Sequence, residues 1–233
     1  MNKLAGLSAL RCLGGALCLS LGSLMPLAWA QASVSVNIGI NVPVYPQLVP
    51  VPGYPVYYAP RLDNNFFYYD GLYWVFVDGN WYDSLWYNGP WRVVSPEFVP
   101  VYILRVPVRY YRRPPPYFRG WAVNAPPRWG ERFGPAWEQH HRGWEHWSRA
   151  SAPPPAPPPS YQRQYKGEHY PQAVQEQQAL HGQHYRYQPK DPVVQQHYEH
   201  MGVPPAVPAP HGEGKGKGQD RGHGQGKHEE RER

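Results

Sequence analysis

The chain has 233 residues, of which 30 are proline and 23 are glycine, and its formal charge is +6, from 23 Lys and Arg against 17 Asp and Glu. Proline and glycine are both unfavourable inside regular elements, so this composition excludes a protein built mainly from long helices and strands. The small basic excess is diluted by 12 acidic residues after Pro114, which argues against nucleic acid as a partner.

The first 30 residues are predicted to be an export signal. Lys3 and Arg11 give a positive start, an apolar run from Leu13 to Met25 follows, and Ala28-Trp29-Ala30 fits a small-residue cleavage site. We therefore expect cleavage after Ala30 and a mature chain in the periplasm, in the cell envelope or secreted. The alternative is an uncleaved anchor, although the run is short for a transmembrane span.

Both cysteines, Cys12 and Cys18, lie inside this segment, and neither follows a convincing lipobox. The mature chain therefore has no thiolate chemistry and no disulfide, although an oxidising compartment would allow one. Without the signal, 21 basic residues minus 17 acidic residues leave a formal charge of +4. This charge suits weak contact with anionic components of the envelope.

Two segments ahead of the aromatic-rich region are predicted to be extended. Residues from Ser33 to Asn41 alternate apolar and polar side chains, a pattern typical of a half-buried strand. Residues from Pro43 to Pro60 hold six prolines among Val and Tyr. They are expected to be extended or polyproline II and to run into the first strand of a meander.

The stretch from Phe66 to Trp91 has Phe, Trp or Tyr at 12 of its 26 positions. It repeats one pattern three times: aromatic, any residue, Asp or Asn, Gly, any residue, aromatic. The central dipeptides favour type I′ turns because both residues must adopt positive φ; they are Asp70-Gly71, Asp78-Gly79 and Asn88-Gly89. Two-residue turns would place three aromatic pairs opposite each other: Tyr68 with Tyr73, Phe76 with Trp81, and Trp86 with Trp91.

This pattern predicts an antiparallel meander over residues 66–95, with Asp83-Ser84 either in the third strand or in an additional turn. The register gives the sheet two aromatic faces. The first face carries Phe67, Trp74, Phe76, Trp81 and Leu85. The second face carries Tyr68, Tyr73, Tyr82, Trp86 and Trp91. Either both faces are covered by other parts of the chain, or the second one is exposed and binds a ligand by ring stacking.

The motif Trp86-Tyr87-Asn88-Gly89-Pro90-Trp91 is a complete W-x-x-G-x-W, and the other two copies are aromatic variants of it. It resembles the repeats of exported bacterial proteins with YXWGXW-type motifs, whose function is unassigned. The resemblance covers about 30 residues and departs from the pattern at Tyr68, Tyr73 and Phe76. The chain is also similar to uncharacterised exported proteobacterial proteins with proline-rich tails. Neither resemblance implies an activity or a site.

Residues from Tyr102 to Arg105 are predicted to add a strand, which Pro107 would restrict to an edge. Residues 31–113 would then form one small β domain. A core of this size is marginal without a disulfide, so dense aromatic packing or homo-oligomerisation is expected to compensate.

Residues 114–150 are rich in proline and tryptophan and are expected to contain one short helix. Gly134-Pro135 begins it, because proline suits the first helical position. Trp137, Trp144 and Trp147 would share one face of this helix. That stripe packs on the sheet in one interpretation and binds a partner in the other.

Residues 151–233 are predicted to be a low-complexity and mostly disordered tail. Their only expected element is a weak helix over residues 192–201, with Asp191 as its N-cap. The fold class predicted for the whole chain is mainly β. It is a small antiparallel aromatic-rich meander with a short helical segment and a long disordered tail rich in Pro, Gln, His and Gly.

The chemistry available to the predicted core is narrow. Residues 33–113 contain no His, Lys or Cys, so a nucleophile there has no ordinary partner base. Asp63, Asp83 and Glu97 remain as acid–base candidates, and their spacing favours solvated loop acids over a catalytic pair. We therefore expect a non-enzymatic protein without a cofactor.

All 11 histidines lie at or after His140. Two pairs have the i, i+3 spacing that brings ligands together on a helix: His181 with His184, and His197 with His200. They are candidates for weak transition-metal binding, although none has the spacing of a closed zinc site. The alternative is that these histidines only make the tail more polar.

Two classes of function remain. The first is a structural or interaction protein of the cell envelope with an unknown envelope protein as its partner. The second is a carbohydrate- or peptidoglycan-binding module that uses the second face of the sheet. Burial of these rings distinguishes the two classes.

Overall fold

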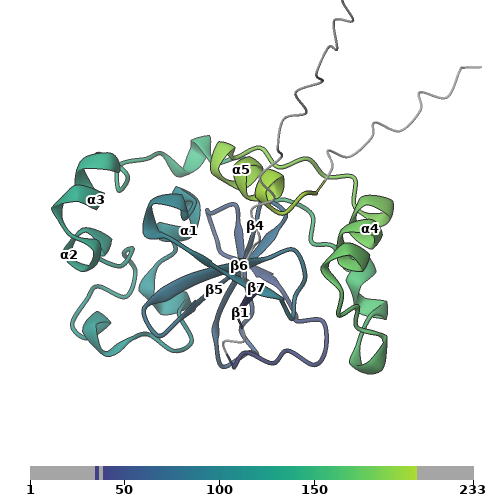
Figure 1. Ribbon diagram of the computed structural model, residues 1–233. Coiled ribbons are helices and arrows are strands. Elements are labelled where there is room, and N and C mark those ends of the chain that lie inside the picture. Colours follow the sequence, from purple (N-terminus) through teal and green to yellow (C-terminus); the bar gives the residue numbers. More distant parts are fainter. Residues whose placement is uncertain (1–34, 37–38, 204–233) are drawn as a thin grey trace, which may run out of the picture. The chain divides into compact units, whose positions relative to one another are not determined.

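The computed structural model describes residues 35–36 and 39–203. The predicted signal segment and the last 30 residues, 204–233, lie outside the described residues. Within the described part, one antiparallel sheet of seven strands is accompanied by five short α-helices (Figure 1). No helix of this part is long and apolar enough to cross a membrane.

The strands lie side by side in the order β1-β7-β6-β5-β4-β3-β2. They are β1 (Ser35–Val36), β2 (Val49–Pro50), β3 (Val56–Tyr58), β4 (Asn65–Tyr69), β5 (Leu72–Val77), β6 (Asn80–Ser84) and β7 (Trp91–Val94). The helices are α1 (Val101–Leu104), α2 (Trp129–Phe133), α3 (Pro135–His140), α4 (Val174–His184) and α5 (Pro192–His200). Six 3₁₀ turns join them: Pro96–Phe98, Val108–Tyr110, Pro116–Phe118, Arg149–Ser151, Ser160–Gln164 and Gly167–His169.

The first two copies of the repeat form the predicted hairpins. Tyr68 lies opposite Tyr73, and Phe76 lies opposite Trp81. The two turns adopt positive φ at both central residues, as type I′ requires: Asp70 49°, Gly71 100°, Asp78 51° and Gly79 80°. The aspartates and glycines of these copies therefore fix the register of the three central strands.

The third copy does not form a two-residue hairpin, so the predicted Trp86–Trp91 pair is wrong. Asp83 pairs with Arg92 at the end of β6, and residues 85–90 form a longer loop. Gly89 has a φ of 84°, but Asn88 is not left-handed. The Asn88 side chain instead accepts a hydrogen bond of 2.6 Å from the backbone N–H of Val42. A long-range contact therefore overrides the local turn preference.

Asp83 and Ser84 were predicted to lie either in the third strand or in an additional turn. Both belong to strand β6 and both are buried, so the first alternative holds. Ser84 Oγ accepts a hydrogen bond of 3.1 Å from the backbone N–H of Trp86, which starts the loop. The Gly89–Pro90 peptide at its other end is cis.

The proline-rich segment from Pro43 to Pro60 is more regular than predicted. It contains the hairpin of β2 and β3, in which Val49 lies opposite Tyr58. Pro52-Gly53 lies in the connection, and Gly53 has a φ of 79°. Of the strand predicted from Ser33 to Asn41, the described residues include β1, which pairs with β7, and residues 39–41, which are not in a strand.

The strand predicted over Tyr102–Arg105 is wrong, because Val101–Leu104 is helix α1. Pro100 stands at its N-cap, and its carbonyl accepts hydrogen bonds from the backbone N–H groups of Ile103 and Leu104. The β-branched and aromatic residues of this segment favour a strand, but Pro100 precedes a helical turn instead. Ile103 and Leu104 bury their side chains in the core.

The first face of the sheet is covered by residues that follow the meander. Trp129 of α2 contacts Phe76 at 5.3 Å and Trp81 at 5.8 Å between ring centroids. Tyr111 contacts Phe67 at 5.1 Å. Helices α1 to α3 accordingly lie on one side of the sheet in Figure 1, and α4 lies on the other.

The second face is covered by residues predicted to be a disordered tail, and for residues 151–203 that prediction is wrong. The Tyr68 hydroxyl lies 2.6 Å from the Tyr185 hydroxyl. The Tyr73 hydroxyl donates a 3.0 Å hydrogen bond to Gln162 Oε1. This segment folds because its spaced tyrosines, buried amides and short helices have an aromatic sheet to pack on.

The two helices expected from the sequence begin where predicted. Helix α3 starts at Pro135, but it ends at His140, so Trp144 and Trp147 do not continue a helical stripe. Trp137 donates a 3.1 Å hydrogen bond from Nε1 to the Pro96 carbonyl. Helix α5 has Asp191 as its N-cap, whose Oδ1 accepts a 2.9 Å hydrogen bond from the Val193 N–H.

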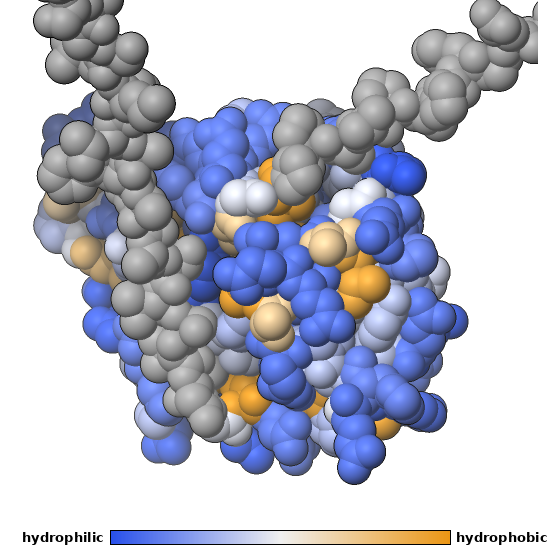
Figure 2. Space-filling model, turned by 45° about the vertical axis from the view of Figure 1, so that its right-hand side comes forward, coloured by the Kyte–Doolittle hydropathy of each residue, from blue (hydrophilic) through white to orange (hydrophobic). Residues whose placement is uncertain are grey.

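On the face shown in Figure 2, the surface is mainly polar and apolar residues appear as small separate spots. The largest fully buried side chains include Trp74, Trp81, Trp86 and Trp129.

We predict that Gly71→Ala lowers the free energy of unfolding by about 2–4 kcal/mol. Part of the loss is left-handed strain, about 1–2 kcal/mol, and part is the hydrogen bond that the Tyr198 hydroxyl donates to the Gly71 carbonyl. An added Cβ would overlap that hydroxyl. Urea unfolding measures the change. The control is Gly120→Ala, which has a similar φ of 85° but no atom within 4 Å of the new Cβ; equal losses would contradict the predicted contact.

We predict that Gln162→Leu costs about 2–3 kcal/mol of stability, because it leaves two buried polar groups without partners. The Gln162 side chain accepts from the Tyr73 hydroxyl and donates to the Leu85 carbonyl at 3.0 Å. Gln164→Leu, at an exposed position of the same turn, should change stability by less than about 0.5 kcal/mol. Thermal unfolding that fails to separate the two variants would argue against packing of this segment on the sheet.

Candidate functional site

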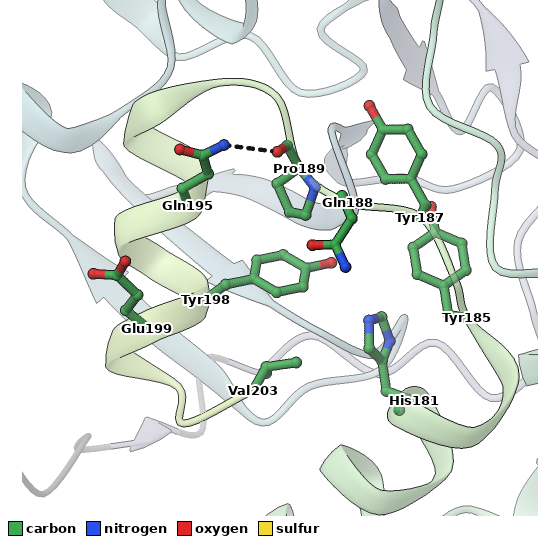
Figure 3. A pocket seen from close by; sticks show the side chains of 10 residues that line it. His181, Tyr185, Tyr187, Gln188, Pro189, Gln195, Tyr198, Glu199 and Val203 are labelled. Atoms are coloured by element: carbon green, nitrogen blue, oxygen red, sulfur yellow. Dashed lines mark hydrogen bonds between the residues drawn. The ribbon is translucent and has the colours of Figure 1, made fainter. Parts of the chain in front are cut away.

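A pocket of about 230 Å³ lies between α4, α5 and the segment that connects them (Figure 3). Three tyrosine rings, two glutamine amides, one carboxylate and one imidazole line it. The lining residues are His181, Gly182, Tyr185, Tyr187, Gln188, Pro189, Gln195, Tyr198, Glu199 and Val203. Figure 3 shows Tyr198 projecting from α5 toward the space between Tyr185 and His181.

Asp70, in the turn between β4 and β5, holds the connecting segment in place. Its Oδ2 accepts hydrogen bonds from the backbone N–H groups of Lys190 at 2.8 Å and Asp191 at 2.7 Å. Its Oδ1 accepts a third, from the Tyr187 hydroxyl, at 2.6 Å. Burial raises the pKa of Asp70, although these three hydrogen bonds oppose that effect. One turn residue therefore sets both a hairpin of the sheet and one wall of the pocket.

The tyrosine walls are rigid because their hydroxyl groups are bonded inside the protein. Tyr198 donates to the Gly71 carbonyl at 3.0 Å, and Tyr185 donates to the Pro157 carbonyl at 2.6 Å. Burial raises the pKa of both hydroxyls, which keeps them protonated. Both rings are therefore held in fixed positions beside the pocket.

His181, the imidazole of the pocket, is buried and neutral. Burial lowers its pKa from 6.5 to about 3, because the protein around it disfavours the charged form. Its Nδ1 lies 3.1 Å from the Tyr161 hydroxyl, which also accepts a hydrogen bond from Gln162 Nε2. The Tyr161 hydroxyl thus links the imidazole to the Gln162 amide.

The open side of the pocket is polar. Glu199, Gln188 and Gln195 are exposed residues at the rim. Gln195 donates a 2.9 Å hydrogen bond from Nε2 to the Pro189 carbonyl, which leaves its carbonyl oxygen at the rim. The Glu199 carboxylate adds a charged acceptor.

A second polar cluster, made of Asp83, Arg92 and His197, lies on the first face of the sheet and is mostly buried. Arg92 donates to both carboxylate oxygens of Asp83, at 3.0 and 2.6 Å. His197 of α5 places Nδ1 at 2.8 Å from Asp83 Oδ2 and Nε2 at 2.8 Å from the Phe98 carbonyl. His197 Nδ1 also lies 3.3 Å from Arg92 Nη2, so both ring nitrogens have partners inside the protein.

This cluster attaches α5 to the sheet and offers no reactive group. The Asp83 side chain is 0% exposed, and the bidentate contact with Arg92 fixes both of its oxygens. Residues 33–113 contain no histidine, but the fold places His197 of α5 next to Asp83 in this part of the sheet. The burial of His197 could have been predicted from the spacing of Val194, His197 and Tyr198, which form the buried face of α5.

The five predicted stacking residues do not form an exposed surface. Tyr68, Tyr73 and Trp86 are 0% exposed and Trp91 is 3% exposed, whereas Tyr82 is half-buried. Trp86 lies in the loop after β6 and donates a 3.1 Å hydrogen bond to the Gln177 carbonyl of α4. The aromatic faces are core, so a ligand would have to bind elsewhere on the folded chain.

The acid–base and metal-ligand candidates predicted from the sequence do not come together in one site. Asp63 lies 3.9 Å from Arg113 and is mostly exposed, and Glu97 is in the 3₁₀ turn after β7. His184 stacks on Tyr161 with ring centroids 5.4 Å apart, while its predicted partner His181 is buried. His197 has both nitrogens bonded, so it is not free to pair with His200. The described residues contain no group of three or more potential metal ligands.

Comparison of the chain with protein-family models, with curated proteins and with solved structures found no match.

We predict that His181 makes the fold less stable in acid. In the unfolded chain this imidazole takes up a proton near pH 6.5, whereas in the folded chain it does so only near pH 3. The stability that it contributes is therefore complete above about pH 6.5 and declines as the pH falls toward 3, by up to about 1.4 kcal/mol per pH unit. Urea unfolding of the wild type and of His181→Gln at about pH 7 and about pH 5 tests this. The stability advantage of the wild type over the variant should shrink by about 1–2 kcal/mol at the lower pH.

The matched control is His184→Gln, which removes an exposed imidazole from the same helix. The free energy of unfolding of this variant should change between the two pH values by the same amount as that of the wild type. A His181→Gln variant with the same pH dependence as the wild type would contradict the buried, neutral imidazole.

Proposed function

We propose that this chain is an exported, non-enzymatic interaction protein of the cell envelope, and that its pocket between α4 and α5 binds a sugar residue of an envelope glycan. The observation that carries this proposal is the combination of rigid tyrosine rings with amide, carboxylate and imidazole groups around about 230 Å³. Aromatic rings pack against the C–H faces of sugars, and polar side chains at the rim bind their hydroxyl groups.

The geometry of the walls supports binding without large rearrangement. The hydroxyl groups of Tyr185, Tyr187 and Tyr198 are bonded to Pro157, Asp70 and Gly71, so the rings are already ordered before a ligand arrives. Such preorganisation reduces the entropic cost of binding. The free acceptors at the rim, Glu199 and the Gln195 carbonyl, suit a donor-rich ligand such as a sugar.

The placement in the envelope rests on the sequence. The first 30 residues have the composition of an export signal, and the aromatic repeats resemble those of exported bacterial proteins. The mature charge of +4 is compatible with contact with anionic envelope material.

A purely structural role is the second candidate, and the internal bonding of the tyrosines favours it. The contacts between the sheet and residues 157–185 include hydrogen bonds of the hydroxyl groups of Tyr68, Tyr73 and Tyr185. In that case the folded domain would be a spacer or a carrier for other segments of the chain, and the pocket would be a by-product of packing.

We predict that Glu199→Ala weakens binding of N-acetylglucosamine oligomers about tenfold, the effect of losing one charge-assisted hydrogen bond of about 1.4 kcal/mol. Isothermal titration calorimetry on the mature chain measures this. The control is Gln196→Ala, an exposed change on the same helix outside the pocket lining, which should leave affinity unchanged. Equal affinity of the two variants, or no binding by the wild type, would favour the structural role.

A further inference from the structure

A second pocket, of about 400 Å³, lies far from α4 and α5 in the sequence and is lined by different residues. The turn between β5 and β6, the run Pro114–Pro115–Pro116 and helix α2 enclose it. Two arginines, Arg113 and Arg132, line it together with the ring of Tyr117 and the amides of Asn64 and Asn65.

Arg132 is held at this pocket without a carboxylate partner. Its guanidinium carbon lies 5.4 Å from the centre of the Tyr117 ring. Gly79 leaves room for it on the other side, since a Cβ at that position would stand 3.2 Å from Arg132 Nη2. Among residues 39–203, no Asp or Glu lies within ion-pair distance of this side chain. The guanidinium interacts with Tyr117, and no carboxylate of these residues competes with a ligand for its N–H donors.

Arg113 is fixed through its backbone. The buried side chain of Asn65 accepts a 2.8 Å hydrogen bond from the Arg113 N–H and donates one of 2.8 Å to the Arg113 carbonyl. The three prolines that follow restrict the chain further. The Arg113 guanidinium makes only a 3.9 Å contact with Asp63, and both side chains are mostly exposed, so this contact is weak.

The lining of the pocket suits a singly charged anion better than a doubly charged one. The lining residues carry two guanidinium groups and one carboxylate, that of Asp78, and the exposed Asp63 contacts Arg113 from outside the lining. Guanidinium groups bind carboxylates through paired N–H donors, and the pocket adds apolar surface from Pro115 and Tyr117 for the rest of a ligand. A phosphate dianion would leave the site with excess negative charge.

We propose that this pocket binds a small organic acid through its carboxylate, at a site separate from the one between α4 and α5. The proposal goes beyond the glycan pocket and does not require it, because the two sites share no residue. It assigns the Arg132 guanidinium as the principal contact and Arg113 as the second.

Nuclear magnetic resonance of the arginine Nε–H groups in the mature chain tests this proposal. The probes are galacturonate, galactose and inorganic phosphate, added at constant ionic strength. Galacturonate is expected to shift the resonances of Arg113 and Arg132 in the same concentration range, whereas galactose leaves them in place. Arg132→Gln should weaken galacturonate binding about tenfold, and Arg113→Gln gives an independent second variant.

The matched control is Arg128→Gln, at the start of α2, because Arg128 is paired with Glu131 and does not line the pocket. It should bind galacturonate like the wild type, and so should Glu199→Ala, which distinguishes this site from the other pocket. The proposal is overturned if galacturonate shifts neither arginine, if galactose shifts them equally, if phosphate binds as tightly as galacturonate, or if Arg132→Gln and Arg128→Gln behave alike.

Discussion

The fold depends on covering a sheet that has aromatic rings on both faces. An ordinary antiparallel sheet leaves one face wet, but β4 and β5 are buried along almost their whole length. Each ring buries about 150–250 Å² when it packs, so an uncovered face would lose a large part of the stabilisation of this small domain. Residues 101–137 and helix α5 cover the first face, and residues 156–185 cover the second. The chain after the meander is thus required for the sheet itself.

Tyrosine and glutamine suit this cover because they combine a buried body with a polar end. Buried hydroxyl and amide groups need partners, and here they find each other across the boundary between the sheet and its cover. Tyr68 with Tyr185, and Tyr73 with Gln162, are such pairs. These hydrogen bonds fix where the covering segment lies, which apolar packing alone would not do. A segment of low hydrophobicity can therefore be ordered on an aromatic sheet.

Both pockets lie where covering segments meet the hairpin turns. Asp70, in the turn between β4 and β5, binds the segment that leads into α5 and so shapes the first pocket. Gly79, in the turn between β5 and β6, gives room to the Arg132 guanidinium at the second. The type I′ turns therefore have two effects. They fix the register of the strands, and they position polar side chains around the turns. This coupling brings side chains from distant segments together around each pocket.

The local sequence determined the central hairpins, since Asp-Gly at positions 70–71 and 78–79 tolerates positive φ and the aromatic pairs set the register. It also determined the start of α5, through the Asp191 side chain. The third turn was decided by tertiary structure, because the bond from Val42 to Asn88 has no local signal. The same holds for residues 151–203. Their composition is typical of a disordered segment, but their rings pack on the aromatic sheet, and this packing orders them. His197 and Asp83, and equally Arg113 and Arg132, are far apart in the chain, so only folding could bring each pair to one place. Short-range preferences fix turns and caps, whereas burial of rings and pairing of buried polar groups depend on residues that the chain brings together over long distances.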